Sequence, residues 1–585
     1  MSLSVADVDA FAPRTRALAV GLSRAVFVSE DGEIEEMTLE DAAAYLRALE
    51  PPLLCHGPAL ARRLDLPLFP AFDLLELFAF ARPAQFTVPT PKGLAQALGL
   101  AEPRGLEGEA LALHDAARAL LNELAAPGIR HGAEAVAIAQ AMSRGGWLWG
   151  ASVEAALRLA GARGAAARKG SALAVWTRLN EWSDEAPPPP PGNLAVFPAE
   201  TLERLARLLG EGAESRPQQK AFAQAAARAF AAPNEAEQPR VVVAEAGTGV
   251  GKTLGYIAPA SLWSEKNEGP VWLSTYTRNL QRQIDRELDR LYPDPREKAE
   301  RAVLRKGREN YLCLLNFEDA ANRAALLPTE RVALGLMARW AEASRDGDMV
   351  GGDFPAWLVS LLGARRTLEL TDKRGECIYS ACPHYRRCFI EKSQRLARRA
   401  QLVIANHALV MAQAALAAED LSDDRALPSR YVFDEGHHLF DAADSTFSAL
   451  LSGAEAHELR RWLLGPERTA ARGAGSRARG LANRVADLVE GSDALARALE
   501  ETLKAARALP ALGWHERLAA DAPQGPAERF LALVRTQVLA RGRDVRGPYS
   551  IETETLPPVP GLPEAAQALD GALGALSRPM VALAL

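Results

Sequence analysis

The chain has 585 residues, of which 48% are hydrophobic and 24% charged, and its formal net charge is −6. This length is too great for one hydrophobic core and predicts three or four domains of a soluble globular protein. The charge balance excludes a protein that binds a polyanion through a globally basic surface, so any such contact must be local. No apolar run approaches the ~20 residues that span a bilayer, and no export signal is visible, so we expect a cytoplasmic protein without membrane contact.

Residues 1–185 are rich in Ala and Leu and indicate a mixed α/β domain. Residues 25–28 predict a strand, and Asp31-Gly32 predicts a hairpin turn after it. Five consecutive prolines at 187–191 exclude helix and central strand, so we predict a stiff linker at 186–193 and a domain boundary there.

From residue 194 onward the pattern alternates between strands and helices. Four short apolar runs, at 241–244, 271–274, 402–405 and 431–434, are separated by helix-forming segments. This alternation is typical of a parallel sheet covered by helices on both faces. Beyond about residue 450 the pattern is almost entirely helical.

The first apolar run is followed by a glycine-rich segment at 246–253, Ala-Gly-Thr-Gly-Val-Gly-Lys-Thr. Such a turn lets backbone N–H groups surround phosphate oxygens, and the helix that follows directs its N-terminus at the same charge. Lys252 is expected to reach the β/γ-phosphates, and Thr253 to place its hydroxyl on Mg²⁺. Ala246 stands where the strict pattern has Gly, and chance in a Gly- and Ala-rich chain is the alternative. The flanking strand and helix favour nucleotide binding.

Asp434-Glu435-Gly436-His437 ends the last apolar run. A phosphate loop needs a carboxylate across the sheet to hold Mg²⁺ and a second group to orient the attacking water. We assign the first role to Asp434 and the second to Glu435. Taken alone, this segment would be a solvated acidic turn; the phosphate loop upstream favours the catalytic interpretation.

Four of the five cysteines, Cys313, Cys377, Cys382 and Cys388, lie within 76 residues of one another. Thiolates are soft ligands that suit zinc or an iron–sulfur cluster. Structural zinc usually draws on two close pairs of ligands, and these four cysteines do not form two such pairs. One distant and three close cysteines favour a [4Fe–4S] cluster, while zinc and unliganded buried thiols remain open at this point.

Together these motifs resemble the superfamily 2 iron–sulfur DNA helicases of the DinG/XPD kind, and most of all the bacterial DinG group. The resemblance covers about residues 214–445, with the motifs in the family's order. It rests on Arg-Pro-Gln-Gln at 216–219, the phosphate loop, Ser-Thr-Tyr-Thr at 274–277, Lys-Gly-Arg-Glu-Asn-Tyr-Leu-Cys at 306–313, Ala-Asn-His-Ala-Leu at 405–409 and Asp-Glu-Gly-His at 434–437. The last departs from the family's Asp-Glu-Ala-His.

The resemblance implies a RecA-like P-loop lobe at 194–296 plus 400–450, with an iron–sulfur insertion at 297–399. It also implies a helical arch at 451–585, after a degenerate exonuclease-like α/β domain at 1–185. The expected catalytic residues are Lys252, Asp434, Glu435 and His437. ATP would be held by Gln219, Gly247, Thr248, Gly249, Gly251, Lys252 and Thr253. Thr253 and Asp434 would hold Mg²⁺, and the four cysteines a [4Fe–4S] cluster.

Nucleic-acid contacts are expected from two sets of residues. The resemblance assigns Ser274, Thr275 and Thr277 to the DNA backbone. Independently, Arg386, Arg387 and Arg395 lie among aromatic residues near the last cysteine, a mixture that can neutralise phosphates and stack unpaired bases. A solvated helix face is the alternative for each basic run, including a third from Arg460 to Arg484 that could line the arch. No base-reading motif is present, so we expect sequence-independent binding.

The family resemblance implies an ATP-dependent 5′→3′ helicase that acts in DNA repair or replication, as a monomer, on single-stranded DNA and duplex junctions. Only about 150 residues follow Glu435, without a second α/β alternation, so we expect truncation before motif III and weak activity of this chain.

The segments 53–57, 72–77 and 113–117 loosely resemble proofreading-type 3′–5′ exonucleases, but the acid expected after His56 is missing. A hairpin turn explains Asp31 and Glu33 better than a metal site, so we favour an inactive remnant. Two alternatives to the helicase remain: an ATP-regulated 3′–5′ exonuclease, and a nucleotide-switched DNA-binding module that does not unwind.

Overall fold

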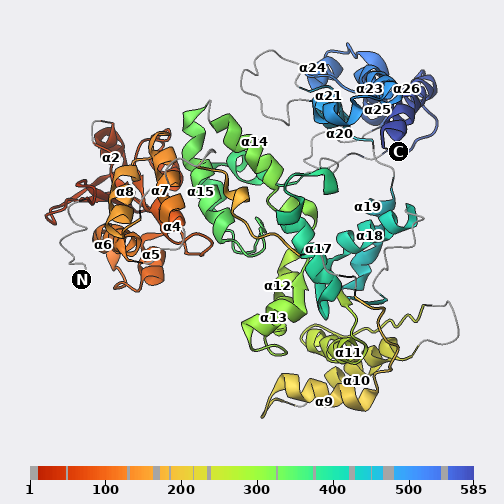
Figure 1. Ribbon diagram of the computed structural model, residues 1–585, viewed down its shortest axis with the longest axis horizontal. Coiled ribbons are helices and arrows are strands. Elements are labelled where there is room, and N and C mark those ends of the chain that lie inside the picture. Colours follow the sequence, from red (N-terminus) through yellow and green to blue (C-terminus); the bar gives the residue numbers. More distant parts are fainter. Residues whose placement is uncertain are drawn as a thin grey trace. The chain divides into compact units, whose positions relative to one another are not determined.

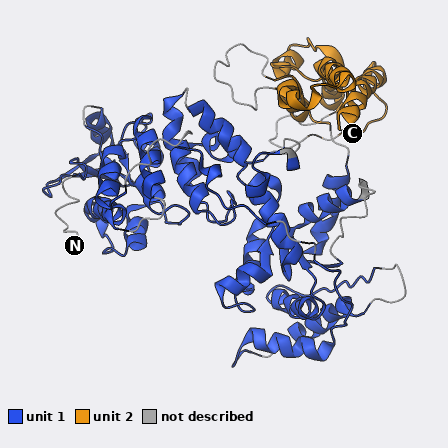
Figure 2. Cartoon of the chain, in the orientation of Figure 1, with its two compact units in different colours: residues 1–448 blue, residues 449–585 orange. Residues whose placement is uncertain are grey.

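The computed structural model describes residues 11–47, 50–127, 132–162, 172–183, 186, 188–214, 216–232, 239–324, 327–372, 377, 379–419, 429–448, 451–465, 480–541, 551 and 553–584. The chain forms two compact units, Met1–Ser448 and Ala449–Leu585, which Figure 2 colours separately. In the described part of the chain, no helix combines the length and apolar character needed to cross a membrane.

The N-terminal domain contains a five-stranded sheet in the order β3-β2-β1-β4-β5. Its strands are β1 (Ala17–Val20), β2 (Arg24–Val28), β3 (Ile34–Thr38), β4 (Leu53–Leu54) and β5 (Phe72–Asp73). The first three pair antiparallel, whereas β4 and β5 continue the sheet in parallel. The predicted strand at 25–28 and the hairpin turn after it are confirmed, with Gly32 at φ +85° in the turn.

Helices cover this sheet and extend the domain (Figure 1). They are α2 (Leu39–Leu46), α3 (Gly57–Arg63), α4 (Leu74–Ala81), α5 (Pro91–Leu98), α6 (Gly105–Ala125), α7 (Gly132–Ser143) and α8 (Gly150–Leu159). Most of α4 is buried, because six of its eight residues are apolar side chains that face the core. Asp73 begins this helix by accepting a hydrogen bond from Leu75 N, which satisfies a helix-terminal donor.

The second sheet is parallel throughout, as predicted, and has the order β7-β8-β6-β9. Its strands are β6 (Val271–Thr275), β7 (Ala302–Leu304), β8 (Leu402–Asn406) and β9 (Arg430–Phe433). Alternate residues point to opposite faces: Leu273 packs with α11 (Lys252–Asn267), whereas Trp272 shares a core with Val410 of α18 (His407–Glu419). Both faces are therefore covered. β7 belongs to this sheet although it lies within the range predicted for the insertion.

Further helices around the second sheet are α9 (Pro198–Leu209), α10 (Pro217–Ala227), α12 (Arg278–Glu287), α13 (Pro295–Arg301) and α19 (Leu439–Phe447). The sheet lacks one expected strand. Residues 241–244 are irregular, and Val241 and Val243 are 77% and 92% exposed. The prediction of a strand there is wrong for this structure, because an extended apolar segment becomes a strand only when a neighbour pairs with its backbone. β9 is the edge strand on its side of the sheet.

The insertion between α12 and β8 is mainly helical. Its helices are α14 (Leu314–Ala324), α15 (Arg331–Ala343), α16 (Trp357–Leu362) and α17 (Phe389–Arg399). All four of these helices contribute to the same hydrophobic core as the N-terminal domain, α17 through Phe389. This shared core was not foreseen from the sequence.

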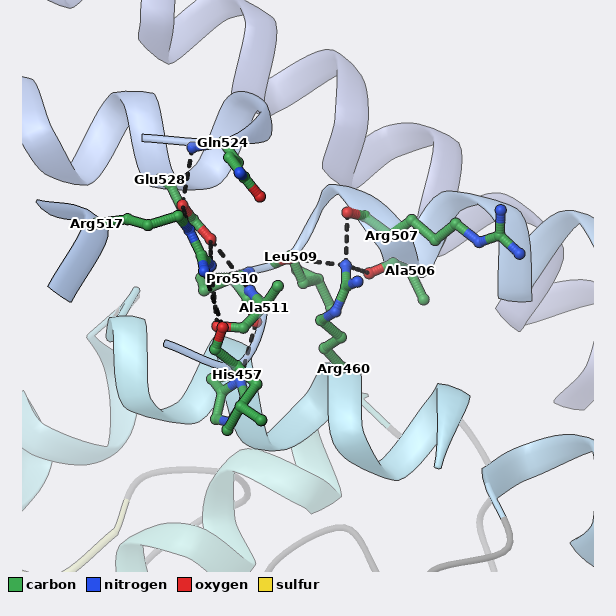
Figure 3. Close-up of polar contacts among 11 residues, drawn as sticks. His457, Arg460, Ala506, Arg507, Leu509, Pro510, Ala511, Arg517, Gln524 and Glu528 are labelled. Carbon is green, nitrogen blue, oxygen red and sulfur yellow. Dashed lines mark hydrogen bonds and ion pairs between the residues drawn. The ribbon is translucent and has the colours of Figure 1, made fainter. Parts of the chain in front are cut away.

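The second unit has only helical secondary structure among its described residues, as predicted. Its helices are α20 (Gly453–Leu464), α21 (Gly480–Arg484), α22 (Ala486–Val489), α23 (Asp493–Ala505), α24 (Trp514–Ala519), α25 (Gly525–Arg541) and α26 (Leu562–Ala584). Arg460 of α20 donates to the carbonyl oxygens of Arg507 and Leu509, at 2.6 and 3.0 Å (Figure 3). This guanidinium therefore holds the unit together instead of lining a channel. Residues 466–479 of the same basic run lie outside the described residues.

Candidate nucleotide and metal site

The glycine-rich loop leads directly into α11, as predicted. Gly251 occupies the residue before the helix at φ +88°, and Gly249 has φ +80°, conformations that L side chains rarely adopt. A Cβ at Gly251 would also lie 2.2 Å from Gln219 Nε2. Gly247 and Thr248 are exposed, so the first half of the loop is open to a ligand.

The N-terminal end of α10 holds the second half of this loop. The buried Gln219 side chain donates from Nε2 to Gly251 O at 2.9 Å, and Arg216 donates to Gly249 O at 3.0 Å. The structure thus brings Gln219 to the phosphate loop, where its amide positions the backbone. Thr253 lies in the first turn of α11.

The acidic pair lies across the sheet edge from this loop. Lys252 Nζ is 3.3 Å from Glu435 Oε1, although the two residues are 183 positions apart in the chain. Asp434 N donates to Ser274 O at 2.8 Å, and Thr275 Oγ1 donates to Asp434 Oδ2 at 3.4 Å. These contacts place the two acids and the loop lysine in one site. Thr275 and Asp434 meet because the parallel strands β6 and β9 present their C-terminal ends at the same edge of the sheet, and Lys252 reaches them from the start of α11.

Burial raises the pKa of Asp434, and the neighbouring Glu435 raises it further, while Lys252 opposes both effects. A carboxyl group held this way gains from a divalent cation, because a bound cation favours its ionised form. Glu435 has φ +55°, a strained conformation for a non-glycine residue. Strain of this kind is common where a site fixes the direction of a side chain.

His437 and His438 follow the acidic pair. His437 Nδ1 is 3.6 Å from Glu435 Oε2, and its side chain is largely exposed. The ring of His438 stacks on Tyr276, with centroids 3.9 Å apart and an interplanar angle of 13°. The end of β6 is therefore tied to the acidic loop by side-chain stacking as well as by backbone contact.

His407 is a site residue for which no role was predicted from the sequence. It begins α18 directly after β8 and is 1% exposed. Its Nδ1 lies 2.8 Å from Ser274 Oγ, and burial lowers its pKa, so the imidazole is neutral near pH 7. The Asn-His pair within the motif at 405–409 was the available signal, but nothing in the sequence tells what the ring contacts.

The predicted DNA contacts are only partly accessible. Ser274 and Thr275 are both fully buried, which corrects the expectation that their side chains touch a DNA backbone. Both lie at the end of a strand that is covered on both faces. Thr277 is exposed and caps α12, accepting a hydrogen bond from Leu280 N.

The arginines near the last cysteine contact the segment that leads to the proline-rich linker. Arg387 forms an ion pair with Glu181 at 2.7 Å, and the Arg395 guanidinium lies 3.4 Å from the centre of the Trp182 ring. The backbone carbonyl of Arg386 accepts from Trp182 N at 2.9 Å. Arg387 and Arg395 therefore have protein partners where the sequence predicted nucleic acid.

Cys313 lies directly before α14, Cys377 and Cys382 lie in the segment that leads to α17, and Cys388 lies directly before α17. Burial raises the pKa of Cys313 to about 12 and that of Cys388 to about 11. Neighbouring thiols add smaller effects in the same direction: Cys388 raises the pKa of Cys313, and Cys377 raises the pKa of Cys382 and of Cys388. The four sulfurs are thus electrostatic neighbours. Among the residues that the structure describes, however, no three His, Cys, Asp or Glu side chains are arranged to hold a metal ion.

Hydrogen-bond donors surround these sulfurs. Arg308 donates to Cys377 Sγ at 2.8 Å, and Tyr379 N donates to the same atom at 3.3 Å. Cys313 and Cys388 each immediately precede a helix whose first backbone N–H groups face the sulfur. N–H groups directed at sulfur stabilise thiolates and tune iron–sulfur clusters, so the donor set fits a thiolate-bound metal.

Known proteins resemble this chain over less than half of its length. The ATP-dependent DNA helicase YoaA of Escherichia coli is 32% identical over 257 residues, which are 43% of this chain and 37% of that protein. The ATP-dependent helicase DinG of Mycobacterium tuberculosis is 32% identical over 262 residues, which are 42% of this chain and 37% of that protein. Over these residues the chain is similar to the DinG-like helicases.

The 3′-5′ exonuclease DinG of Bacillus subtilis is also similar to this chain, with 29% identity over 227 residues, or 36% of this chain and 22% of that protein. No protein-family model matches the chain. The chain spans little more than a third of the length of the helicases it matches.

Proposed function

We propose that this chain works as an ATP-dependent DNA helicase that moves 5′→3′ along single-stranded DNA and separates duplexes. The observation that carries the proposal is the meeting of Lys252 with the Asp434–Glu435 pair at one edge of the parallel sheet, with a 3.3 Å contact between Lys252 and Glu435. Phosphate-binding and acidic segments that converge in this way are the two halves of an ATP hydrolysis site.

In the proposed site, the phosphates of ATP lie over the open backbone of the glycine-rich loop and the start of α11. The Thr253 hydroxyl and the Asp434 carboxylate would hold Mg²⁺, and the charge of the cation would favour the ionised form of Asp434. Glu435 then turns from Lys252 to orient the attacking water. Lys252 is freed to neutralise the γ-phosphate, so nucleotide binding breaks the Lys252–Glu435 ion pair.

The contacts between β6 and the acidic loop provide a physical route from DNA to the nucleotide. Exposed Thr277 follows the buried Ser274 and Thr275, and these two contact His407 and Asp434. A DNA backbone held near Thr277 would therefore bias the position of the metal ligand. DNA-stimulated ATP hydrolysis is the expected result.

For the insertion we propose a [4Fe–4S] cluster held by Cys313, Cys377, Cys382 and Cys388. The electrostatic proximity of the four sulfurs and the N–H groups directed at them support this proposal. The cluster would supply a rigid covalent link between segments far apart in the chain. Ligand binding requires four deprotonated thiols, so loading would release protons.

The decisive experiment compares Lys252→Ala with Lys266→Ala, a lysine on the same helix that pairs with Glu200 away from the loop. We expect Lys252→Ala to weaken binding of a fluorescent ATP analogue with Mg²⁺ at least about tenfold, since a charge-assisted contact is lost. Lys266→Ala should bind as the wild type does. Absence of nucleotide binding by the wild-type chain would refute the proposal; binding without DNA-stimulated hydrolysis would leave only a nucleotide-switched DNA-binding module.

The nuclease alternative is less well supported, even though one relative is named an exonuclease. Asp73 is buried, and its two oxygens accept hydrogen bonds from the backbone N–H groups of His56, Gly57 and Leu75. It therefore has a structural role in starting two helices. The nuclease would be favoured if the wild-type chain degrades single strands in the presence of metal and the Asp115→Asn variant, with unchanged folding stability, does not.

A further inference from the structure

The N-terminal domain and the cysteine-bearing insertion share one hydrophobic core. It includes Phe78 and Met142 from the former, and Phe317, Met337 and Trp357 from the latter. The Phe78 and Trp357 rings meet edge to face, with centroids 6.4 Å apart. A common apolar core couples the stability of two segments, because neither can open without exposing the other's buried surface.

Helix α15 of the insertion is shaped to fit the N-terminal domain. It packs on α7 and α4 (Figure 1), with Gly335 so close to Met142 that a Cβ would lie 2.3 Å from Met142 Cγ. One turn further on, buried Arg339 donates to Phe80 O at 3.2 Å. The contact is therefore made by backbone-close packing and by a buried charge with a specific acceptor, features that separate it from incidental surface contact.

Trp176 lies between the two segments that carry the cysteines. Its ring is 6.0 Å from Phe317 of α14, the helix that begins next to Cys313. It is 5.7 Å from His384, which lies between Cys382 and Cys388. His384 Nε2 in turn contacts Glu318 Oε2 of α14 at 2.7 Å. One aromatic side chain of the N-terminal domain thus contacts both cysteine-bearing segments.

Trp182 makes a second contact with the same turn. Its Nε1 donates to Tyr385 O and its backbone N to Arg386 O, both at 2.9 Å. Its ring meets Tyr385 edge to face and lies under the Arg395 guanidinium. Trp182 therefore contacts two residues of the 382–388 turn, Tyr385 and Arg386, and Arg395 in the helix that follows the turn.

We propose that the N-terminal domain is the scaffold of the cysteine site: it keeps α14 and the 382–388 turn together whether or not metal is bound. This gives a function to a domain whose buried Asp73 already has a structural role. The inference deepens the proposed cluster site, and only its iron measurement rests on that proposal.

The test measures thiol labelling in reduced, metal-free full-length chain, with each cysteine followed separately by peptide mapping. Trp176→Ala should speed maleimide labelling of Cys382 and Cys388 about tenfold or more, because local opening exposes them. Trp176→Phe keeps the ring contacts and should restore most of the protection. Trp462→Ala, which removes a tryptophan from the other unit, should leave labelling unchanged.

Trp182→Ala is the second variant, because its site is nearer the surface and the substitution leaves the shared core intact. Trp182→Ala should speed labelling of Cys382 and Cys388 about threefold or more. If Trp176→Ala does not fold, the labelling rate of Trp182→Ala alone decides whether the N-terminal domain is the scaffold. Wild-type labelling rates in every Trp176 and Trp182 variant that folds would overturn the inference.

Iron retention adds a separate measurement. After anaerobic reconstitution, both alanine variants should lose iron to a chelator several-fold faster than the wild type or Trp462→Ala does. If the wild-type chain takes up no iron, the cluster proposal fails, while the labelling comparison still decides whether the N-terminal domain is the scaffold.

Discussion

The nucleotide site and the cysteine site both assemble residues that are far apart in the chain, but different forces hold them. At the sheet edge, Lys252 and Glu435 meet through partly exposed polar contacts on a loop that is open to solvent. In the insertion, the segments that carry the cysteines lie against a large apolar core shared with the N-terminal domain. A polar, open site can rearrange around a ligand, whereas a site held by a shared core is held in place before the ligand arrives.

The largest expected effect comes from the shared core. Phe317→Ala removes a fully buried ring and should lower the free energy of unfolding of the Met1–Ser448 unit by about 3–5 kcal/mol. Chemical denaturation would measure this loss. A loss below about 1 kcal/mol would show that α14 is not part of a cooperative core and would remove the contrast between the two sites.

Glu76 tests the same core through pH. Burial, and secondarily Asp73, raises the pKa of Glu76 to about 8, against a hydrogen bond from Trp147. The folded domain therefore keeps a proton that the unfolded chain loses above about pH 4.5, and stability falls as pH rises from there to about 8. The slope from this one group approaches about 1.4 kcal/mol per pH unit. Glu76→Gln should flatten thermal stability across this window; an unchanged pH profile would place the carboxyl outside the core.

At the nucleotide site the expected effect is on ligand binding and not on folding. Asp434→Asn removes the proposed metal ligand while keeping the size of the side chain, so Mg²⁺ should no longer strengthen nucleotide binding, with about a tenfold loss of affinity in its presence. Titrations with and without Mg²⁺ would measure this. Thermal stability should stay within about 1 °C of wild type or rise slightly, because the substitution removes a buried charge. Undiminished Mg²⁺ dependence would mean that another group holds the metal.

The smallest effect is expected at the contact between β6 and α18. Ser274→Ala removes the hydroxyl that faces His407 Nδ1 and should cost about 1 kcal/mol of stability. If the β6 contacts carry DNA stimulation to the acidic pair, this variant should also lower the ratio of DNA-stimulated to basal ATP hydrolysis. If the ratio of DNA-stimulated to basal ATP hydrolysis is the same in Ser274→Ala and in the wild type, the contact between Ser274 and His407 has only a structural role.

Local patterns predicted much of the fold. The apolar runs predicted that β6, β8 and β9 are strands of one parallel sheet, and the glycines before Lys252 predicted the helix that begins there. The strand at 241–244 failed because pairing depends on a neighbour, which a local pattern cannot report. The exposure of the predicted DNA-contact residues could not be derived from the sequence for a related reason. Whether Ser274 or Arg395 reaches the surface depends on which distant segment covers it.

By itself, the sequence determined the chemistry available to this protein: a loop that can bind phosphate, an acidic pair after a buried strand, and four soft ligands in one region. These depend on residue type and on short spacings, which the chain carries directly. Only the tertiary structure decided that Lys252 meets Glu435, that His407 contacts Ser274, and that the N-terminal domain packs on the cysteine-bearing insertion. Such contacts join residues more than a hundred positions apart, and the free energy that selects them comes from burying both partners at once.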